Sequence, residues 1–116
     1  MATYEVNVDA VAKARDLIDA DQYTLDSDWS EAQPDPDEEN ADLERHDYEQ
    51  YALWHLAIDL RAGEDTKGRY AFPHGDFRRV HRSGLIAAKG RAAQNGHDAV
   101  ADAAGDLLDY LDRQIG

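Results

Sequence analysis

Residues 98–114 carry the sequence pattern that most constrains how this chain can fold. Apolar residues recur there at helical spacing, namely Val100, Ala103, Ala104, Leu107, Leu108 and Leu111, while aspartates occupy positions 98, 102, 106, 109 and 112. A pattern with one apolar and one charged face is typical of a surface helix, which must bury its apolar face against another element. The fold must therefore supply a packing partner for this helix.

The segment just before it is the expected partner. Within residues 77–95, one face of the expected helix is formed by Phe77, Val80, Gly84, Ala87 and Ala88, which recur at helical spacing. Asp76 precedes this segment as a helix cap, and Gly96 follows it as a C-terminal glycine. The tight turn at Gly96 predicts that the two helices pack antiparallel as a hairpin.

Three more helices are predicted upstream of this hairpin. Asn7 is the expected cap of a helix that ends near Ala20, with its apolar face formed by Val8, Val11, Ala14, Leu17 and Ile18. A short acidic helix starts at Asp35 or Asp37 and runs through Leu43. Residues 48–60, opened by Asp47, form the most apolar segment and predict a central helix.

The predicted fold class is all-α, a single-domain helical bundle of four to six helices over residues 1–116 with a C-terminal helical hairpin. Residues 21–37 and 61–66 are expected to be loops, and residues 67–72 fit a short helix or an extended piece equally. A chain of 116 residues can bury a core without a disulfide or a metal.

Cysteine is absent, which excludes disulfides, thiolate metal sites and a cysteine nucleophile. The first ten residues lack the basic start and apolar core of a signal peptide, and no run has the length of a membrane span. We therefore expect a cytoplasmic protein that does not enter a membrane.

Acidic residues dominate the chain and are concentrated in its first half. The formal net charge is −13, and residues 1–65 hold 19 of the 25 carboxylates but only 4 of the 12 Lys and Arg. A dense carboxylate surface predicts a halophilic protein, because such a surface stays hydrated at high salt. The same charge repels nucleic acid, so a nucleic-acid partner is not expected.

A helical wheel over residues 77–95 places Arg78, Arg82 and Lys89 in one narrow basic stripe, flanked by Arg79 and His81. The aspartates of the last helix form an opposite stripe. Both stripes lie away from the packed faces, so they need not meet within one molecule and are free to meet between molecules. The alternative is that both are solvated surfaces.

The densest polar cluster is a second candidate site. It comprises Tyr70, His74, Asp76, Arg78, Arg79, His81 and Arg82, with His55 as an outlying member. This set combines an acid–base group with several anion binders, so it fits a small ligand or an enzymatic site, or else a plain turn with surface arginines. His55 and Asp59 have metal-compatible spacing, but no zinc or di-iron motif is present, and neither a metal nor a cofactor is predicted. Phosphate-binding glycine motifs and G-x-S-x-G are absent as well.

The leading functional hypothesis is a non-enzymatic binding or assembly protein that self-associates or docks an acidic protein partner through its charge-segregated surfaces. The residues expected to bind are His55, Tyr70, His74, Arg78, Arg79, His81, Arg82 and Lys89. Two alternatives stay open. One is the ligand or enzymatic site around Tyr70–Arg82, and the other is a nucleic-acid role in which the basic stripe contacts phosphates or the acidic half mimics DNA.

Two resemblances bear on this hypothesis. The segments YALWHLAIDL, DTKGRYAFPHGDFRRVHRSGLIAAKGRAAQNGHD and AAGDLLDYLD resemble a family of small prokaryotic proteins, mainly haloarchaeal, for which no activity is established. That resemblance implies a stand-alone protein adapted to high salt and transfers no site residue. The second half is also similar to a short module of phage head-maturation proteins, at Phe72, Pro73, His74, Asp76, Ala87, Ala88, Ala92, Ala93 and Gly96. That similarity implies an assembly role, and the first half departs from it.

Overall fold

The computed structural model describes residues 4–63 and 65–116. In chain order, its elements are β1 (Tyr4–Val6), α1 (Val8–Asp19), β2 (Tyr23–Thr24), α2 (Trp29–Ala32), α3 (Pro36–Arg45), α4 (Tyr48–Ala52), β3 (His55–Asp59), the 3₁₀ helix η1 (Lys67–Arg69), β4 (Tyr70–Pro73), β5 (Val80–His81), α5 (Arg82–Gln94) and α6 (Asp98–Ile115). The predicted all-α class is therefore wrong, because the chain folds as a mixture of helices and two small sheets.

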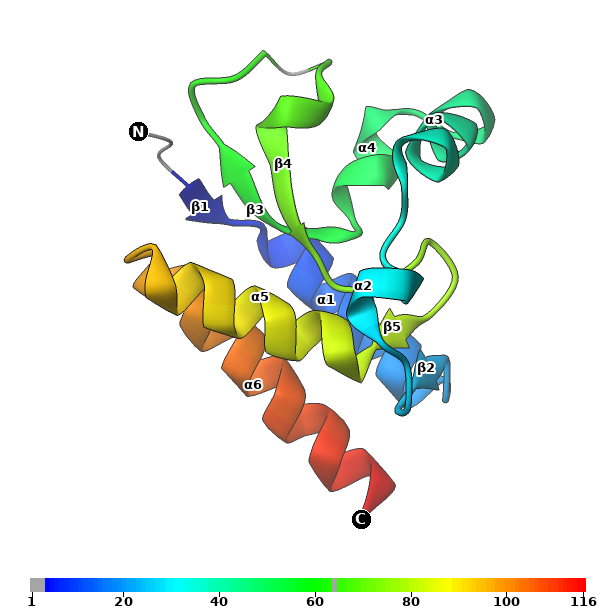
Figure 1. The fold of residues 1–116 in the computed structure, drawn as a ribbon, viewed down its shortest axis with the longest axis vertical. Coiled ribbons are helices and arrows are strands. Elements are labelled where there is room, and N and C mark those ends of the chain that lie inside the picture. The colour runs from blue at the N-terminus through cyan, green and yellow to red at the C-terminus, as the bar shows by residue number, and fades with distance from the viewer. Residues whose placement is uncertain (1–3, 64) are drawn as a thin grey trace.

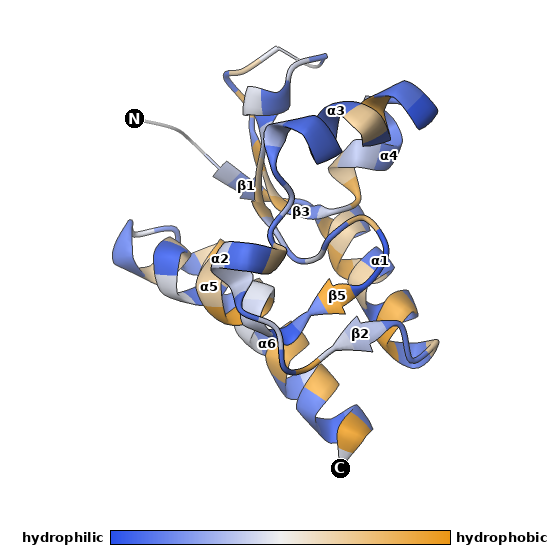
Figure 2. Ribbon diagram, turned by 45° about the vertical axis from the view of Figure 1, so that its right-hand side comes forward, coloured by the Kyte–Doolittle hydropathy of each residue, from blue (hydrophilic) through white to orange (hydrophobic). Residues whose placement is uncertain are grey.

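The three longest helices, α1, α5 and α6, form one side of the molecule, and the β3–β4 hairpin rises from them with α3 and α4 beside it (Figure 1). The larger sheet is antiparallel, with β3 in the centre between β1 and β4. The smaller sheet joins β2 and β5 in parallel, pairing Tyr23 with Val80 and Thr24 with His81. The apolar sides of the long helices face inward (Figure 2).

The predicted C-terminal hairpin is confirmed. Helices α5 and α6 pack extensively on each other, and Gly96 adopts the left-handed conformation (φ 77°) between them, which glycine enters without steric cost. The buried face of α6 consists of Val100, Ala101, Ala104, Leu107, Leu108 and Leu111. Local periodicity identified all of these residues except Ala101, and it correctly put the aspartates on the other side.

Two predicted caps are also confirmed. Asp35 accepts a hydrogen bond from the Glu38 N–H while the Glu38 carboxylate accepts one from the Asp35 N–H, so both open donors at the start of α3 are satisfied. Asp47 accepts the Gln50 N–H at the start of α4. Each of these bonds joins residues three apart, which is why the sequence alone reveals them.

The predicted central helix over residues 48–60 is wrong. Helix α4 ends at Ala52, and residues 55–59 form β3, in which Leu56 and Ala57 are fully buried. A short apolar run suits a buried strand as well as a buried helix. Pairing decides between them here, because β1 and β4 satisfy the backbone groups of both edges of β3.

The predicted helix over residues 77–95 starts five residues later than expected, at Arg82. Asp76 does accept backbone N–H groups, from Arg78 and Arg79, but it closes a turn rather than a helix. Phe77 has a positive φ of 69°, which is incompatible with a helix, and β5 follows. Asp76 therefore accepts backbone N–H groups as a cap does, but these groups belong to a turn and not to a helix.

Asn7 lies at the N-cap position of α1 but does not cap the helix with its side chain. Its Nδ2 donates to the carbonyl oxygens of Ala52 (2.9 Å) and His55 (3.2 Å), which ties α1 to the start of β3. The predicted apolar face is correspondingly rotated. Ala10, Ala14 and Ile18 are the buried residues of α1, and Val8 is 70% exposed.

Asn7→Ala is expected to lower the free energy of unfolding by about 2 kcal/mol, because two carbonyl groups lose their donor and one of those bonds is buried. Urea denaturation measures the change. Asn40→Ala is the matched control, since Asn40 lies exposed in α3 and should give a change within about 0.5 kcal/mol. Equal effects of the two variants would contradict the bridging role.

Candidate functional site

The predicted site residues do not form one site. His55, Tyr70 and His74 belong to the interior around β3 and β4, Arg78 and Arg79 lie exposed in a turn, His81 is buried in β5, and Arg82 and Lys89 lie on α5. The small-ligand hypothesis required a pocket that joins His55 to the segment from Tyr70 to Arg82. The largest pocket on the described part of the chain contains Tyr70 but neither His55 nor that segment beyond it.

His55 and His74 are core residues. His55 Nδ1 lies 3.0 Å from the Tyr51 carbonyl oxygen, and His74 Nε2 lies 2.8 Å from that of Leu53. Burial lowers the pKa of each imidazole to about 4, although these hydrogen bonds act in the opposite direction. Both rings are therefore neutral at pH 7 and hold the segment 51–55 in place.

The basic stripe predicted for α5 does not exist as such, because Arg78 precedes the helix. Moreover, Arg82 is already paired within the molecule: its Nε lies 3.0 Å from Asp112 Oδ1 and its Nη2 3.3 Å from Oδ2. This bidentate contact raises the pKa of Arg82 and lowers that of Asp112. Lys89 lines a hollow of about 390 Å³ with Asp102, Asp106 and Asp109 of α6. Arg82 and Asp112 thus join the two stripes within one chain, whereas the prediction was that the stripes need not meet within one molecule.

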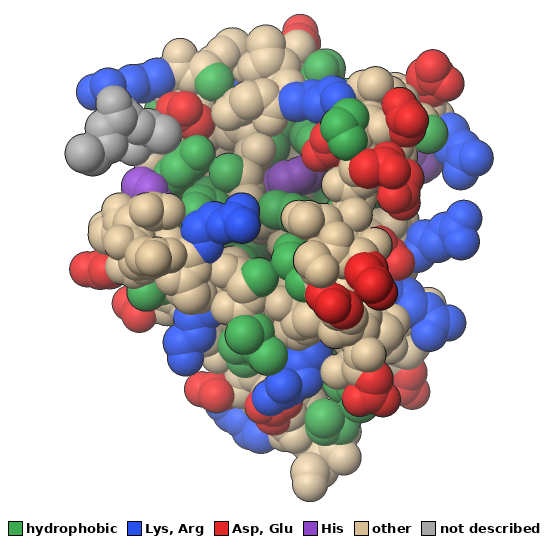
Figure 3. Space-filling view, in the orientation of Figure 1, with side chains coloured by type: hydrophobic (Ala, Val, Ile, Leu, Met, Phe, Trp, Pro, Cys, Tyr) green, Lys and Arg blue, Asp and Glu red, His purple; other side chains and the backbone are tan. Residues whose placement is uncertain are grey.

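Arg78 and Arg79 are two adjacent exposed cations, and we call them the arginine tip. They lie in the turn between β4 and β5. Figure 1 shows this turn on the right-hand side of the molecule, and Figure 3 shows Lys and Arg side chains projecting from that side. Among the ion pairs of residues 4–63 and 65–116, none involves either guanidinium. Their backbone N–H groups donate to Asp76, which holds the backbone of the arginine tip in place.

A polar chain links Asp76, His81, Ser27 and Ser83, of which only Asp76 and His81 were predicted to lie together. His81 Nδ1 lies 2.7 Å from Ser27 Oγ, and Ser27 Oγ lies 2.8 Å from Ser83 Oγ. On the other side of the ring, Nε2 lies 2.9 Å from Asp76 Oδ2. Burial favours the neutral acid, but the backbone N–H groups of Arg79 and Arg78 and the nearby ring of His81 outweigh it and lower the pKa of Asp76.

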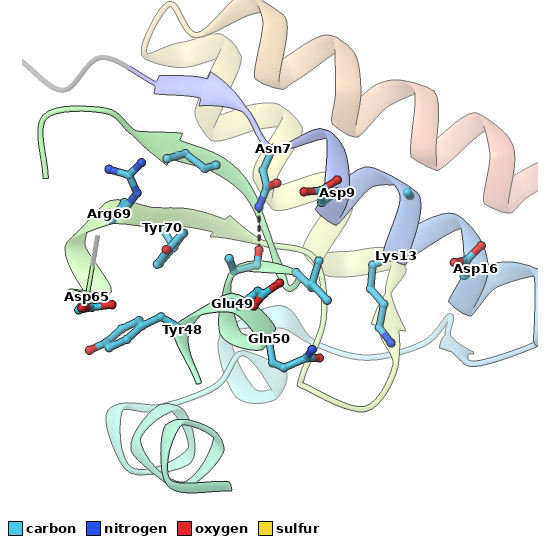
Figure 4. Close-up of a pocket in the computed structure, with 14 residues that line it drawn as sticks. Asn7, Asp9, Lys13, Asp16, Tyr48, Glu49, Gln50, Asp65, Arg69 and Tyr70 are labelled. Atoms are coloured by element: carbon cyan, nitrogen blue, oxygen red, sulfur yellow. Dashed lines mark hydrogen bonds between the residues drawn. The ribbon is translucent and has the colours of Figure 1, made fainter. Parts of the chain in front are cut away.

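The largest hollow is a groove of about 660 Å³ between α1, α4 and the segment that leads into β4 (Figure 4). Its volume lies within the range of about 300–1,000 Å³ that is usual for ligand sites. Asp9, Asp16, Glu49 and Asp65 supply four exposed carboxylates. Asp9 and Asp16 lie on α1 and Glu49 lies on α4, whereas Asp65 lies outside the helices.

Two cations and two aromatic rings complete the groove. Lys13 lies on α1 opposite Gln50, and Arg69 donates through Nη1 to the Ala62 carbonyl oxygen, 3.0 Å away. The rings of Tyr48 and Tyr70 lie 6.3 Å apart, 24° from parallel. With four carboxylates against two cations, the groove has an excess of negative charge. Of its residues, only Tyr70 was predicted to belong to a site, because the others come from separate elements that the fold alone brings together.

Within residues 4–63 and 65–116, no cluster of three or more His, Asp or Glu side chains is placed to bind an ion, and His55 and Asp59 gain no third ligand. Within the same residues, none of the helices combines the length and apolar character needed to cross a bilayer.

Comparison with known proteins adds no identification. No family model, no curated protein sequence and no solved structure matches the chain. The resemblances to a haloarchaeal family and to a phage module therefore stay predictions, and the function has to be argued from the geometry of the surface.

Proposed function

We propose that this protein self-associates, with the arginine tip of one copy bound in the acidic groove of the next. The observation that carries the proposal is the separation of these two surfaces on one molecule. The groove has surplus carboxylates, whereas Arg78 and Arg79 are exposed and unpaired among the described ion pairs. Opposite charges on separate surfaces attract copies of the same chain.

The chemistry of the groove suits a guanidinium group. Tyr48 and Tyr70 offer ring faces, over which an arginine side chain gains cation–π energy. Glu49 lies beside these rings on α4 and offers a planar carboxylate that can accept two parallel N–H bonds. The positive charges of Lys13 and Arg69 repel an incoming guanidinium, but Arg69 already donates to a backbone carbonyl.

Each molecule must use its tip on a neighbour. Arg78 borders a different hollow, of about 300 Å³ against α3, that shares no residue with the groove. A one-way contact of a tip with the next groove is heterologous and gives a ring or an open chain, whereas a reciprocal exchange of tips between two copies closes a two-fold dimer. This distinguishes the present proposal from the earlier hypothesis, in which basic and aspartate stripes of two helices would meet.

High salt does not remove such a contact, although it weakens the attraction. The Debye length is only about 3 Å at 1 M salt, so long-range attraction is screened while groups in direct contact and shielded from water are screened less. A halophilic habitat and a cytoplasmic location both remain part of the proposal. A nucleic-acid partner is disfavoured by the net charge of −13.

Wild-type protein is expected to show a weight-average mass that rises with concentration and falls with added salt, measured by size-exclusion chromatography with light scattering. Arg78→Glu together with Arg79→Glu should weaken association at least tenfold, because two attractive contacts become repulsive. Arg91→Glu with Arg113→Glu is the matched control, since it makes the same charge change at exposed positions away from the tip. A wild type that is monomeric at every salt and concentration would overturn the proposal.

A mixing experiment tests the heterologous geometry. Asp9→Lys with Glu49→Lys damages the groove and leaves the tip, whereas the tip variant leaves the groove intact. Each variant alone should be monomeric, and an equimolar mixture should form dimers that cannot grow, because only one tip and one groove per pair are functional. An interface between two like surfaces predicts no such recovery, and failure of the mixture to dimerise would contradict tip-in-groove docking.

A further inference from the structure

The polar chain at the β2–β5 end of the molecule has the connectivity of a nucleophile, a base and an orienting acid. We propose that Ser27 is a nucleophile activated by His81 and positioned by Asp76, and that it is acylated by small activated carboxylic esters. The groups lie in the required order, with Ser27 Oγ 2.7 Å from His81 Nδ1 and Asp76 Oδ2 2.9 Å from Nε2. This inference does not depend on self-association.

Asp76 is held as an orienting acid needs to be. Its Oδ1 accepts the N–H groups of Arg78 (3.0 Å) and Arg79 (2.8 Å), which leaves Oδ2 directed at the imidazole. Asp76 stays ionised at neutral pH, so it can stabilise a positive charge on the ring. Asp76 is a positioning residue, because it acts through His81.

The imidazole is fixed from other directions as well. His81 belongs to β5, pairs with Thr24 of β2 and is 6% exposed. The Trp29 ring lies against it, with centroids 5.7 Å apart. The ring presents Nδ1 to the serine and Nε2 to the aspartate, so both nitrogens have defined neighbours and the base is oriented before any substrate arrives.

The reaction follows from these positions. Ser27 Oγ attacks the ester carbonyl carbon while its proton passes to His81 Nδ1, and the resulting imidazolium is stabilised by Asp76. The carbonyl oxygen becomes an oxyanion, to which the Ser83 hydroxyl, 2.8 Å from Ser27 Oγ, can donate. Collapse of this intermediate breaks the bond to the alcohol, which leaves with the proton from His81. Water then attacks acyl-Ser27 with His81 as the base and releases the carboxylic acid.

The surroundings limit the substrate class. Ser27 is half-buried, and neither Ser27 nor His81 lines any of the four best-formed hollows of residues 4–63 and 65–116. None of these hollows can receive a bulky acyl group at Ser27, whereas an acetyl-sized group can approach the partly exposed hydroxyl. Small acyl groups on good leaving alcohols are accordingly the expected substrates.

The test uses p-nitrophenyl acetate for turnover and a fluorophosphonate probe for labelling, followed by peptide mapping by mass spectrometry. The label should lie on Ser27, and Ser27→Ala should remove it and lower hydrolysis at least tenfold. Ser30→Ala is the matched control, because Ser30 lies in the same segment, is exposed and donates to Asp28 instead of a histidine. Label on Ser30 or Ser83 to the same extent as on Ser27, or no label at all, would overturn the proposal.

Asp76→Asn separates positioning from folding. The asparagine Oδ1 can still accept both backbone N–H groups, so the circular dichroism spectrum and melting temperature should be close to those of the wild type. The maximal labelling rate should nevertheless fall at least tenfold, with an unchanged half-saturating probe concentration. A labelling rate equal to that of the wild type would show that the aspartate does not act through His81 and would refute the proposed triad.

Discussion

Gly75→Ala is expected to lower the free energy of unfolding by about 3 kcal/mol, the largest single-residue effect that we predict for this chain. A Cβ at position 75 would overlap the Arg79 carbonyl oxygen and lie 2.8 Å from Cζ3 of Trp54. The first of these atoms belongs to the backbone of the same turn and cannot move aside as a flexible side chain does. Overpacking of this kind costs about 1–3 kcal/mol, and displacement of the turn adds to it.

Urea denaturation at pH 7 measures the change, and Gly68→Ala provides the control. A Cβ at Gly68 would have no neighbour within 4 Å, and its φ is not positive. That variant should be neutral or slightly more stable, because alanine reduces the entropy of the unfolded chain. If Gly75→Ala were as stable as Gly68→Ala, the close approach of the turn to Trp54 would be wrong.

Acid is expected to destabilise the protein between pH 6.5 and 4.5. His55 and His74 have pKa values of about 4 in the fold, against an ordinary value of 6.5, so in this window the unfolded chain binds protons that the folded chain does not. Stability therefore falls as the pH falls, by up to about 1.4 kcal/mol per pH unit for each histidine. Together, the two histidines are expected to lower the free energy of unfolding by about 5 kcal/mol at pH 4.5, and this loss is absent above pH 6.5.

Urea denaturation across this pH range, repeated on two variants, assigns the effect. His74→Gln should start less stable at pH 7 but lose about half as much on acidification, because only one buried imidazole remains. His46→Gln should give a curve parallel to that of the wild type, since His46 is exposed at the end of α3. A wild-type stability that is flat from pH 7 to 4.5 would contradict neutral burial of the two rings.

The candidate site was harder to predict than the fold. His74 was predicted to bind because it lies in the densest polar cluster of the sequence, with His55 as an outlying member, but burial and backbone hydrogen bonds make both of them core residues. His81 was predicted as one member of a basic group, whereas its neighbours are Asp76 and a serine 54 residues away. No local pattern identifies that serine, because the contact depends on how β2 and β5 pair.

The C-terminal helix and its neighbour were predictable because their signals are local. Residues within one or two helical turns of each other define the two faces of α6, the end of α5 at Gly96 and the caps at Asp35 and Asp47. Their spacing in the sequence was therefore enough to predict these features. The concentration of acid in the first half also follows from the sequence alone.

Tertiary structure alone decided the rest. Residues 55–59 are a strand because Tyr4–Val6 and Tyr70–Pro73 supply hydrogen bonds on both sides, and no pattern within the segment specifies those partners. The same long-range pairing delays the start of α5, turns Arg78 and Arg79 outward, and gathers the carboxylates of the groove from separate elements. Helical faces are local properties of the chain, whereas strands and sites here arise from contacts between segments far apart in the sequence.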